Sequence, residues 1–291
     1  MHKFLRAIGF SDITKKDLEM ILDEVITRPE IMKITKDSEG NEFAELSGSF
    51  AANAGITVRG TYQEDDSFHM DYYYPYVFGT SITTNEQIDV EKHAEKESYA
   101  GVCDEVNLGV TLIFYIQNVA DYLAETNRHL SKIHYGAMLA GLSTEGKILC
   151  PVVERKKNDV PAIQKNDRHN QLIAQAREGD EDAIESLTLE DMDTYALLSQ
   201  RVMKEDIFSI VKSTFMPFGI ESDQYTVLGE IIDCVTMENK LTHEKLYGMK
   251  LLCNNIQFDV CINEKDLLGE PAIGRRFRGN VWMPVSYTHL T

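Results

Sequence analysis

The sequence contains no long hydrophobic run. Its most apolar stretch, Val110–Ile116, is far shorter than the ~20 residues that a membrane-spanning helix needs. The N-terminal residues, MHKFLRAIGF, include no extended apolar segment followed by a small-residue cleavage site, so we expect no signal peptide. These absences predict that the protein has no membrane partner.

Cysteine is scarce, with 5 in 291 residues. An odd number without any CxxC pair argues against a disulfide framework and against a zinc site. The same scarcity favours a reducing compartment, so the expected location is cytoplasmic. Because Cys234, Cys253 and Cys261 fall in strand-like runs, we expect small buried apolar residues there rather than metal ligands.

Positively charged residues are outnumbered by acidic ones, and familiar catalytic motifs are missing. Lys and Arg number 29 against 47 Asp and Glu, a net charge of −18, which disfavours non-specific attraction to nucleic acid. The chain has no GxSxG, GxxxxGK[ST], GxGxxG or HExxH motif, so the usual hydrolase, kinase and dehydrogenase classes have no support. Acidic residues between 178 and 193 lack EF-hand spacing, and helix caps account for most of them. We predict no metal and no cofactor.

What is present is enough apolar material to fold. With 43% hydrophobic residues in 291, the chain should form two domains of moderate size. The expected fold class is α+β. It combines an N-terminal mixed α/β-sheet domain, a linker, a helical bridge, a C-terminal small five-stranded (OB-like) β-barrel and a short tail. The expected boundaries are 1–154, 155–168, 169–206, 207–283 and 284–291.

The first 76 residues carry clear local signals. Thr14, with Asp17 three residues later, predicts the start of a helix that ends at Pro29 and lays an apolar face on a sheet. Phe43–Tyr76 changes to strand-like alternation with two turns, which predicts a three-stranded antiparallel meander.

The third strand of that meander is rich in tyrosine. Simple alternation places Phe68, Met70, Tyr72 and Tyr74 on one face. Such a face can be a binding platform, which makes Tyr72 and Tyr74 candidate ligand-binding residues. Aromatic packing of the sheet against helices is the favoured explanation.

The rest of the first domain is expected to supply further strands, about six in all. Glu86–Glu97 predicts a helix or an exposed connection, and Val106–Gln117, apolar on both faces, predicts a central strand covered on both sides. Asn118–Glu125 predicts a short helix. Tyr135–Val153 predicts a hairpin that turns at Ser143–Gly146.

The second half begins with helices and ends with strands. Gly179 predicts a helix end, Asp180 caps the next helix, and Thr188 with Asp191 predicts a third start. A short helical turn is expected at Glu264–Leu268. The expected barrel strands lie near 207–216, 226–236, 247–253, 256–262 and 276–283.

Three arginines stand close together near the C-terminus. Guanidinium groups bind phosphate or carboxylate in a forked geometry, so Arg275, Arg276 and Arg278 form a candidate site for an anionic ligand. Pairing of these arginines with neighbouring carboxylates is the favoured alternative in so acidic a chain.

Four segments together resemble a known family. They are MHKFLRAIGF, GVTLIFYIQN, GDEDAIESLTLEDMDTY and FDVCINEKDLLGEPAIGRRFRGNVW. They are similar to an uncharacterised bacterial domain-of-unknown-function family of anaerobic gut Gram-positive bacteria. The resemblance covers nearly the whole chain and implies a bacterial cytoplasmic protein, with no activity, cofactor or catalytic residue.

The last residues, Val285–Thr291, look like translated sequencing-adapter read-through rather than native sequence. A natural exposed tail is the alternative.

Three functional hypotheses follow. The first is a non-catalytic binding or interaction module, with a protein partner or a second copy of the chain as the contact. The second is an enzyme or sensor that binds an anionic small molecule through Arg275, Arg276 and Arg278. The third is OB-like nucleic-acid binding, which needs a basic, aromatic groove.

Overall fold

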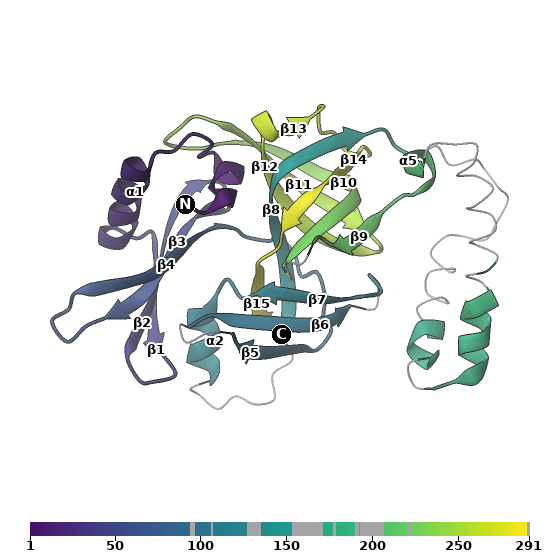
Figure 1. Cartoon of the computed structure of the whole chain (residues 1–291), viewed down its shortest axis with the longest axis horizontal. Helices are drawn as coiled ribbons and strands as arrows, with labels where there is room; N and C mark the ends of the chain where they lie inside the picture. Colours follow the sequence, from purple (N-terminus) through teal and green to yellow (C-terminus); the bar gives the residue numbers. More distant parts are fainter. Residues whose placement is uncertain are drawn as a thin grey trace.

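A computed structural model of the chain describes residues 1–93, 97–105, 107–126, 135–152, 171–176, 179–189, 192, 207–219 and 223–289. The protein is α+β, with three β-sheets and few helices (Figure 1). Within these ranges, no helix has the length and apolar character needed to cross a membrane. The predicted linker at 155–168 lies outside the described residues, and the division into domains stays a prediction.

Helix α1 (Lys15–Thr27) forms as the sequence predicts. The hydroxyl of Thr14 accepts a hydrogen bond from the backbone N–H of Asp17 at 3.2 Å, which satisfies one of the free donors of the first turn. Leu18, Leu22 and Val25 are buried and belong to one core cluster with residues of the neighbouring sheet. Figure 1 shows α1 beside that sheet, with the short 3-10 helix η1 (Lys3–Ile8) next to it.

That first sheet contains the predicted antiparallel meander, with one more strand at its edge. The extra strand, β1, is exposed along most of its length and pairs only with β2. In order across the sheet the strands are β1 (Ile31–Lys36), β2 (Glu42–Ala51), β3 (Ala54–Tyr62) and β4 (Phe68–Val77).

A smaller sheet of three strands corrects two expectations. Glu86–Glu97 contains a strand, β5, instead of a helix or an exposed connection. Strand β5 lies at the edge of its sheet, so its charged side chains remain exposed. Val106–Gln117 contains an edge strand, β7, whose side chains alternate between buried and exposed, so it is not a central strand. Helix α2 (Val119–Thr126) follows as predicted. The strands are β5 (Ile88–Lys92), β6 (Tyr99–Glu105) and β7 (Val110–Tyr115).

The predicted hairpin at Tyr135–Val153 is wrong. One continuous strand, β8 (Tyr135–Leu149), runs through it and pairs in parallel with β12 and antiparallel with β14. The turn-like residues accommodate a β-bulge, where the register against β14 shifts between Asn280 and Val281. Gly146 allows close packing, because a Cβ there would collide with the ring of Phe277.

The large sheet around β8 contains eight strands, of which β10, β11, β12 and β14 lie where the sequence predicts strands. The pairings run from β10 to β11, β12, β8 and β14 and then return to β10. Strands β13 and β15 pair with β8, and β9 pairs with β10. Besides β8, the strands are β9 (Thr214–Pro217), β10 (Gln224–Glu238), β11 (Lys245–Cys253), β12 (Ile256–Asn263), β13 (Leu267–Leu268), β14 (Arg276–Trp282) and β15 (Val285–His289).

The strand expected near 207–216 is replaced by helix α5 (Ile207–Ile210) and the short strand β9. The predicted barrel counted this segment as one of its five strands. In the structure β8, which precedes the predicted linker in sequence, pairs with β12 and β14 instead. The predicted turn at Glu264–Leu268 is present as a 3-10 helix, η2 (Glu264–Asp266). Strand β15 lies in the segment expected to be read-through, and whether that segment is native stays a prediction.

The described part of the helical bridge agrees with its capping signals. Gly179 has φ of +89°, and residues 171–176 and 181–189 on either side are helical. The carboxylate of Asp180 accepts a hydrogen bond from the N–H of Ala183 at 3.1 Å. Thr188 lies inside the second helix, so it does not begin a third.

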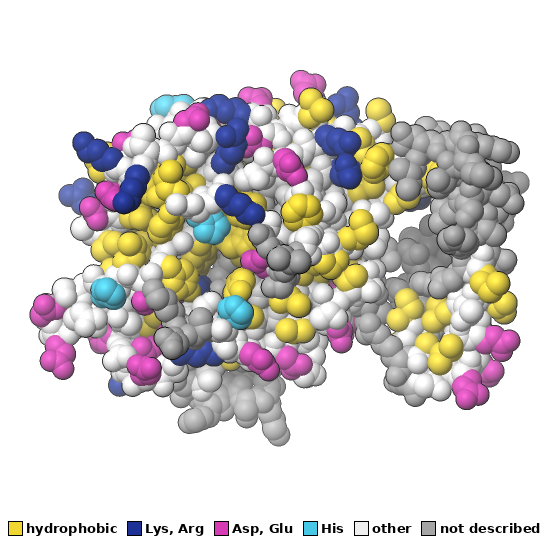
Figure 2. Space-filling view, in the orientation of Figure 1, with side chains coloured by type: hydrophobic (Ala, Val, Ile, Leu, Met, Phe, Trp, Pro, Cys, Tyr) yellow, Lys and Arg dark blue, Asp and Glu magenta, His cyan; other side chains and the backbone are white. Residues whose placement is uncertain are grey.

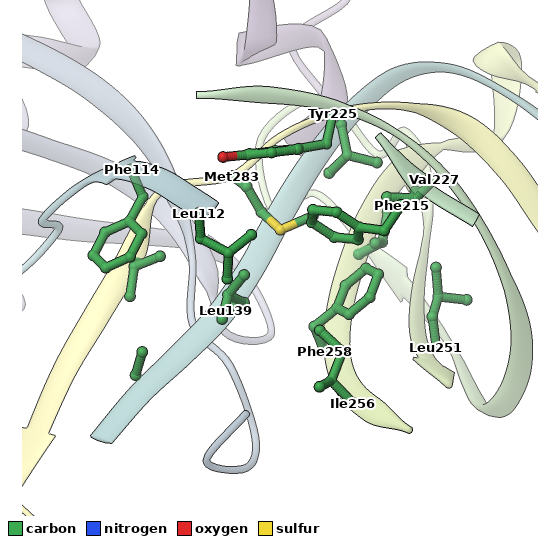
Figure 3. Close-up of a cluster of buried hydrophobic side chains, with 14 of the residues drawn as sticks. Leu112, Phe114, Leu139, Phe215, Tyr225, Val227, Leu251, Ile256, Phe258 and Met283 are labelled. Atoms are coloured by element: carbon green, nitrogen blue, oxygen red, sulfur yellow. The ribbon is translucent and has the colours of Figure 1, made fainter. Parts of the chain in front are cut away.

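One core cluster joins the small sheet to the large one. Figure 3 shows Leu112 and Phe114 of β7 on one side of Leu139, and side chains of β9 to β12 on the other. The hydroxyl of Tyr225 donates to the carbonyl of Ile113 at 2.9 Å and accepts from the backbone N–H of Ile113 at 2.8 Å. This side chain thus satisfies backbone groups at the edge of β7 that a neighbouring strand would otherwise satisfy.

Candidate functional site

A cleft of about 390 Å³ lies where the three sheets meet. It receives residues from the N-terminus, from β3 and β4, from the end of β7, and from one end of the antiparallel β10–β14 pair, where Gln224 lies opposite Trp282. Figure 2 shows hydrophobic side chains exposed across the middle of the molecular face that Figure 1 presents. The rings that line the cleft are those of His2, Tyr72, Tyr73, Tyr74, Tyr115 and Trp282.

A β-bulge places Tyr72 and Tyr74 on the same face of the sheet as Arg59. The register between β3 and β4 shifts so that Arg59 lies opposite Tyr72 while Gly60 lies opposite Met70. Because directly opposed residues share a face, Tyr72 and Tyr74 lie on one face, and Met70 lies on the other. The expectation that Phe68 and Met70 share the face of Tyr72 and Tyr74 is therefore wrong, since simple alternation takes no account of the extra residue.

Arg59 lines the cleft beside Tyr72 and Tyr74 and forms its polar floor. It is only 3% exposed. Its Nε donates to Glu45 Oε1 and its Nη1 to the hydroxyl of Tyr72, each at 2.6 Å. Its Nη2 donates to the backbone carbonyls of Ile116 and Gln117 at 3.0 and 2.7 Å. Burial alone would lower the pKa of Arg59, but the nearby phenol and carboxylate groups raise it above its ordinary value, so the guanidinium stays charged.

Glu45 forms an ion pair with this guanidinium, and its carboxylate also caps the N-terminus of helix α2. Its side chain is 5% exposed, and its two carboxylate oxygens accept hydrogen bonds from the N–H groups of Val119 and Ala120 at 3.1 and 3.0 Å. A carboxylate at a helix N-terminus is stabilising because the free N–H groups carry partial positive charge. The floor of the cleft is thus a buried ion pair that is tied to α2.

Gln117 is held rigidly at the centre of the site and is 5% exposed. Its backbone carbonyl accepts hydrogen bonds from Arg59 and, at 2.6 Å, from the hydroxyl of Tyr74. Its side-chain Nε2 donates to the carbonyls of Val77 and Pro284 at 3.3 and 3.2 Å. Its side-chain Oε1 is buried and accepts no hydrogen bond from the described residues.

Trp282 forms the opposite wall. Its ring stacks on Phe4 with centroids 5.2 Å apart, and its indole N–H donates to the carboxylate of Asp223. The imidazole of His2 lies 4.8 Å from the Trp282 ring, and the backbone N–H of His2 donates to the hydroxyl of Tyr73 at 3.3 Å. The N-terminal segment therefore connects the tyrosine wall to the tryptophan wall.

Two pKa values show the electrostatic character of the cleft. Burial, together with the charges of Lys3 and the N-terminus, lowers the pKa of His2 to about 4, so its imidazole is neutral at pH 7. Burial and the carboxylate of Asp223 raise the pKa of Tyr115. Charges of both signs thus act near the cleft, and the cationic Arg59 is paired with Glu45.

A family model matches residues 5–284 and describes them as a domain of unknown function named for an E. rectale gene, DUF3881. The chain belongs to the DUF3881 family. No curated protein matches it, and no solved structure does. The predicted resemblance is confirmed, and the match spans every residue of the cleft described above except His2.

In this DUF3881 protein the arginine cluster lies away from the cleft. Arg276 is 5% exposed and donates to the backbone carbonyls of Cys150, Phe208 and Val211 at 2.6 to 2.9 Å, so it ties strand ends together. Arg275 donates to the carbonyl of Glu270 at 2.8 Å, and Arg278 lies over the ring of Phe208. These described contacts go to carbonyls and a ring, not to the carboxylates that the alternative expected.

The described residues of the DUF3881 chain contain no group of three His, Cys, Asp or Glu side chains placed to hold a metal ion. Cys253 and Cys261 are buried in strands, as expected, whereas Cys234 is only half-buried.

Sequence reasoning found two cleft residues, Tyr72 and Tyr74, and missed the rest. Gln117, Tyr115 and Trp282 carry no local signal, because they become neighbours only through pairing between distant segments. Arg59 did carry one. It is a lone charged residue in the apolar strand GITVRGTY, and such a residue needs a buried partner.

Proposed function

We propose that this chain is a non-catalytic binding protein that holds one small organic molecule in the cleft between the sheets. The observation that carries the proposal is the convergence of rings from four separate parts of the chain around about 390 Å³. Ligand sites in proteins typically enclose about 300–1,000 Å³, with mainly apolar and aromatic walls and a few fixed polar groups.

The charges of the cleft favour this hypothesis over the anion-binding alternative. Arg59 is paired with Glu45 and His2 is neutral at pH 7, so neither offers a free cation to an anionic ligand. Arg275, Arg276 and Arg278 remain a proposal for a separate anion site. It has less support, because the guanidinium of Arg276 already donates to three carbonyls.

The ring of pairings through β10, β11, β12, β8 and β14 supports our proposal that these strands form a small closed barrel. In this proposal the barrel carries Trp282 at the end of β14 and acts as a rigid support for one wall of the cleft. We also propose that the protein works in the cytoplasm, which is supported by its five free cysteines.

A thermal-shift screen tests the proposed function. The panel contains aromatic heterocycles, amines, nucleotides, cyclic dinucleotides and carboxylic acids. A ligand at 100 times its Kd stabilises the native state by about 2.7 kcal/mol, which raises the melting temperature measurably. We expect neutral and basic aromatic compounds to stabilise the protein.

Two tyrosine variants locate the effect. Tyr115→Ala removes a half-buried ring of the cleft, and Tyr62→Ala removes a half-buried ring that packs on Phe68 outside it. Stabilisation by a ligand should fall in Tyr115→Ala and persist in Tyr62→Ala. If no compound stabilises the wild type, or if both variants respond like it, the cleft is not the binding site, and a protein partner or a second copy becomes the better hypothesis.

A further inference from the structure

Strand β4 has one edge without a neighbouring strand, and this edge borders the cleft. Within the described residues β4 is the last strand of its sheet and pairs only with β3. Three consecutive residues of β4, Tyr72, Tyr73 and Tyr74, line the cleft. Gln117, another lining residue, lies along the same edge, because its Nε2 donates to the carbonyl of Val77 at the end of β4.

The register of the β3–β4 pair shows which backbone groups point to the free edge. In antiparallel strands, opposed residues alternate between pairs that exchange two hydrogen bonds and pairs whose N–H and C=O groups point away from each other. The N–H of Phe78 donates to the carbonyl of Asn53 at 2.8 Å, just beyond the opposed residues Val77 and Ala54, so these two form a pair of the second kind. Counting back in steps of two, with no register shift between, places Tyr73 in a pair of the second kind as well.

Two features of the same strand agree with this direction. Pro75 lies between Val77 and Tyr73 in the count, and proline is tolerated in a strand where no N–H is needed by the neighbouring strand. The carbonyl of Val77 accepts a hydrogen bond from a side chain outside the sheet. The N–H and C=O of Tyr73, a half-buried residue, therefore point to the free edge, and neither has a partner among the described residues.

A backbone donor and acceptor on one residue of a strand edge are complementary to the same two groups of another extended residue. The side chain of that second residue would share the face of Tyr73, because directly opposed residues share a face. On that face the hydroxyl of Tyr73 accepts from the backbone N–H of His2 at 3.3 Å, and the imidazole of His2 lies 4.8 Å from the ring of Trp282. These rings suit an aromatic side chain.

We propose that the ligand is a short peptide, one residue of which pairs with Tyr73 as an added β-strand does. Its N–H donates to the carbonyl of Tyr73, and its C=O accepts from the N–H of Tyr73. The register shift beyond Tyr72 and the missing N–H of Pro75 flank this position, which favours a short peptide over a long added strand. This inference rests on the proposed function and adds the chemical class of the ligand.

Two small compounds form a matched pair for the test. The first is N-acetyl-phenylalanine N-methylamide, and the second is O-acetyl-phenyllactic acid N-methylamide, in which an oxygen replaces the N–H that faces the carbonyl of Tyr73. The full chain, labelled with ¹⁵N, is titrated with each compound, and dissociation constants are measured from the shifts of the cleft amides. We expect the first compound to bind about tenfold more tightly, the effect of one hydrogen bond.

Hydrogen exchange reports on the same position directly. In the free chain the N–H of Tyr73 should exchange faster than those of Tyr72 and Tyr74, which point toward β3. Saturation with N-acetyl-phenylalanine N-methylamide should slow the exchange of Tyr73.

Tyr73→Pro and Tyr73→Ala supply the protein arm. Both variants remove the ring, but only proline removes the N–H, at a position where β3 does not need it. N-acetyl-phenylalanine N-methylamide should bind Tyr73→Pro about tenfold more weakly than Tyr73→Ala. If Tyr73→Pro does not fold, the matched compounds and the exchange of Tyr73 in the wild type still decide the question.

The outcomes separate the inference from the proposed function. Equal binding of the two compounds, an unchanged exchange rate at Tyr73, or equal affinities of the folded variants would overturn the inference and leave the binding function intact. A cleft that binds other compounds of the panel but not N-acetyl-phenylalanine N-methylamide would also overturn the inference alone. A cleft whose amides respond to no compound would overturn both.

Discussion

Replacing Arg59 with methionine should destabilise the protein far more than replacing an exposed lysine. The guanidinium and the Glu45 carboxylate lie 2.6 Å apart, with side chains only 4% and 5% exposed. In Arg59→Met the carboxylate keeps two N–H donors from α2 but loses its counter-charge, and the carbonyls of Ile116 and Gln117 lose a donor. Breaking a buried ion pair from one side typically costs about 3–5 kcal/mol, and we expect a decrease of that size in the free energy of unfolding.

A double-mutant cycle separates the pair from the packing around it. Glu45→Gln should be similarly costly, because it leaves a buried guanidinium without a carboxylate. The double variant Arg59→Met/Glu45→Gln contains neither charge, so it should be more stable than the sum of the two changes predicts, by about 2 kcal/mol. Lys15→Met is the control, since Lys15 and Glu19 form an exposed pair at 3.7 Å and its loss should change stability by less than about 0.5 kcal/mol.

Equilibrium urea unfolding at pH 7, followed by circular dichroism, measures the wild type and all four variants. A loss of less than about 1 kcal/mol in Arg59→Met would refute the reasoning. Strict additivity in the cycle would refute it as well. Either result would mean that Arg59 is solvated or mobile, and the cleft would then have a free cation with which to bind anions.

The remaining predictions concern stability and pH. His2 has a pKa lowered to about 4, whereas an unfolded histidine titrates near 6.5, so the unfolded chain binds more protons between these values. The free energy of unfolding should therefore fall as pH drops from about 6.5 to 4, and less so in His2→Phe, as urea unfolding at each pH would show. Tyr225→Phe should cost about 1–2 kcal/mol, because Ile113 loses both hydrogen bonds. Asn239→Ala should cost about 2–3 kcal/mol, because the side-chain oxygen of this fully buried residue accepts hydrogen bonds from the N–H groups of Leu241 and Thr242. An unchanged denaturation midpoint in Tyr225→Phe or in Asn239→Ala would contradict the assigned contacts.

Local sequence signals predicted those parts of the fold that depend on nearby residues. The cap at Thr14, the meander and strands β10, β11, β12 and β14 follow from side-chain alternation and from turn or cap residues within a few positions. Strand β8 could not be predicted in this way. Its parallel pairing with β12 joins residues about 120 positions apart, and the turn-like residues near Gly146 serve a bulge and a close contact with Phe277 instead.

The candidate site shows the same division. A tyrosine-rich strand is visible in the sequence, so Tyr72 and Tyr74 were predicted, but the bulge that turns them toward Arg59 is not. Gln117 has no distinguishing neighbours in sequence, and its place in the site comes from hydrogen bonds to distant groups. The arginine run is conspicuous in sequence, yet Arg276 is used to join strand ends.

The most direct test of the central claim uses the single tryptophan of the chain, Trp282, which lies in the wall of the cleft. Its indole ¹H–¹⁵N resonance, followed while compounds that stabilise the protein are added, reports on the cleft alone. The account predicts a saturable shift that weakens in Tyr115→Ala and persists in Tyr62→Ala. Compounds that stabilise the protein and leave the Trp282 resonance unchanged would contradict it.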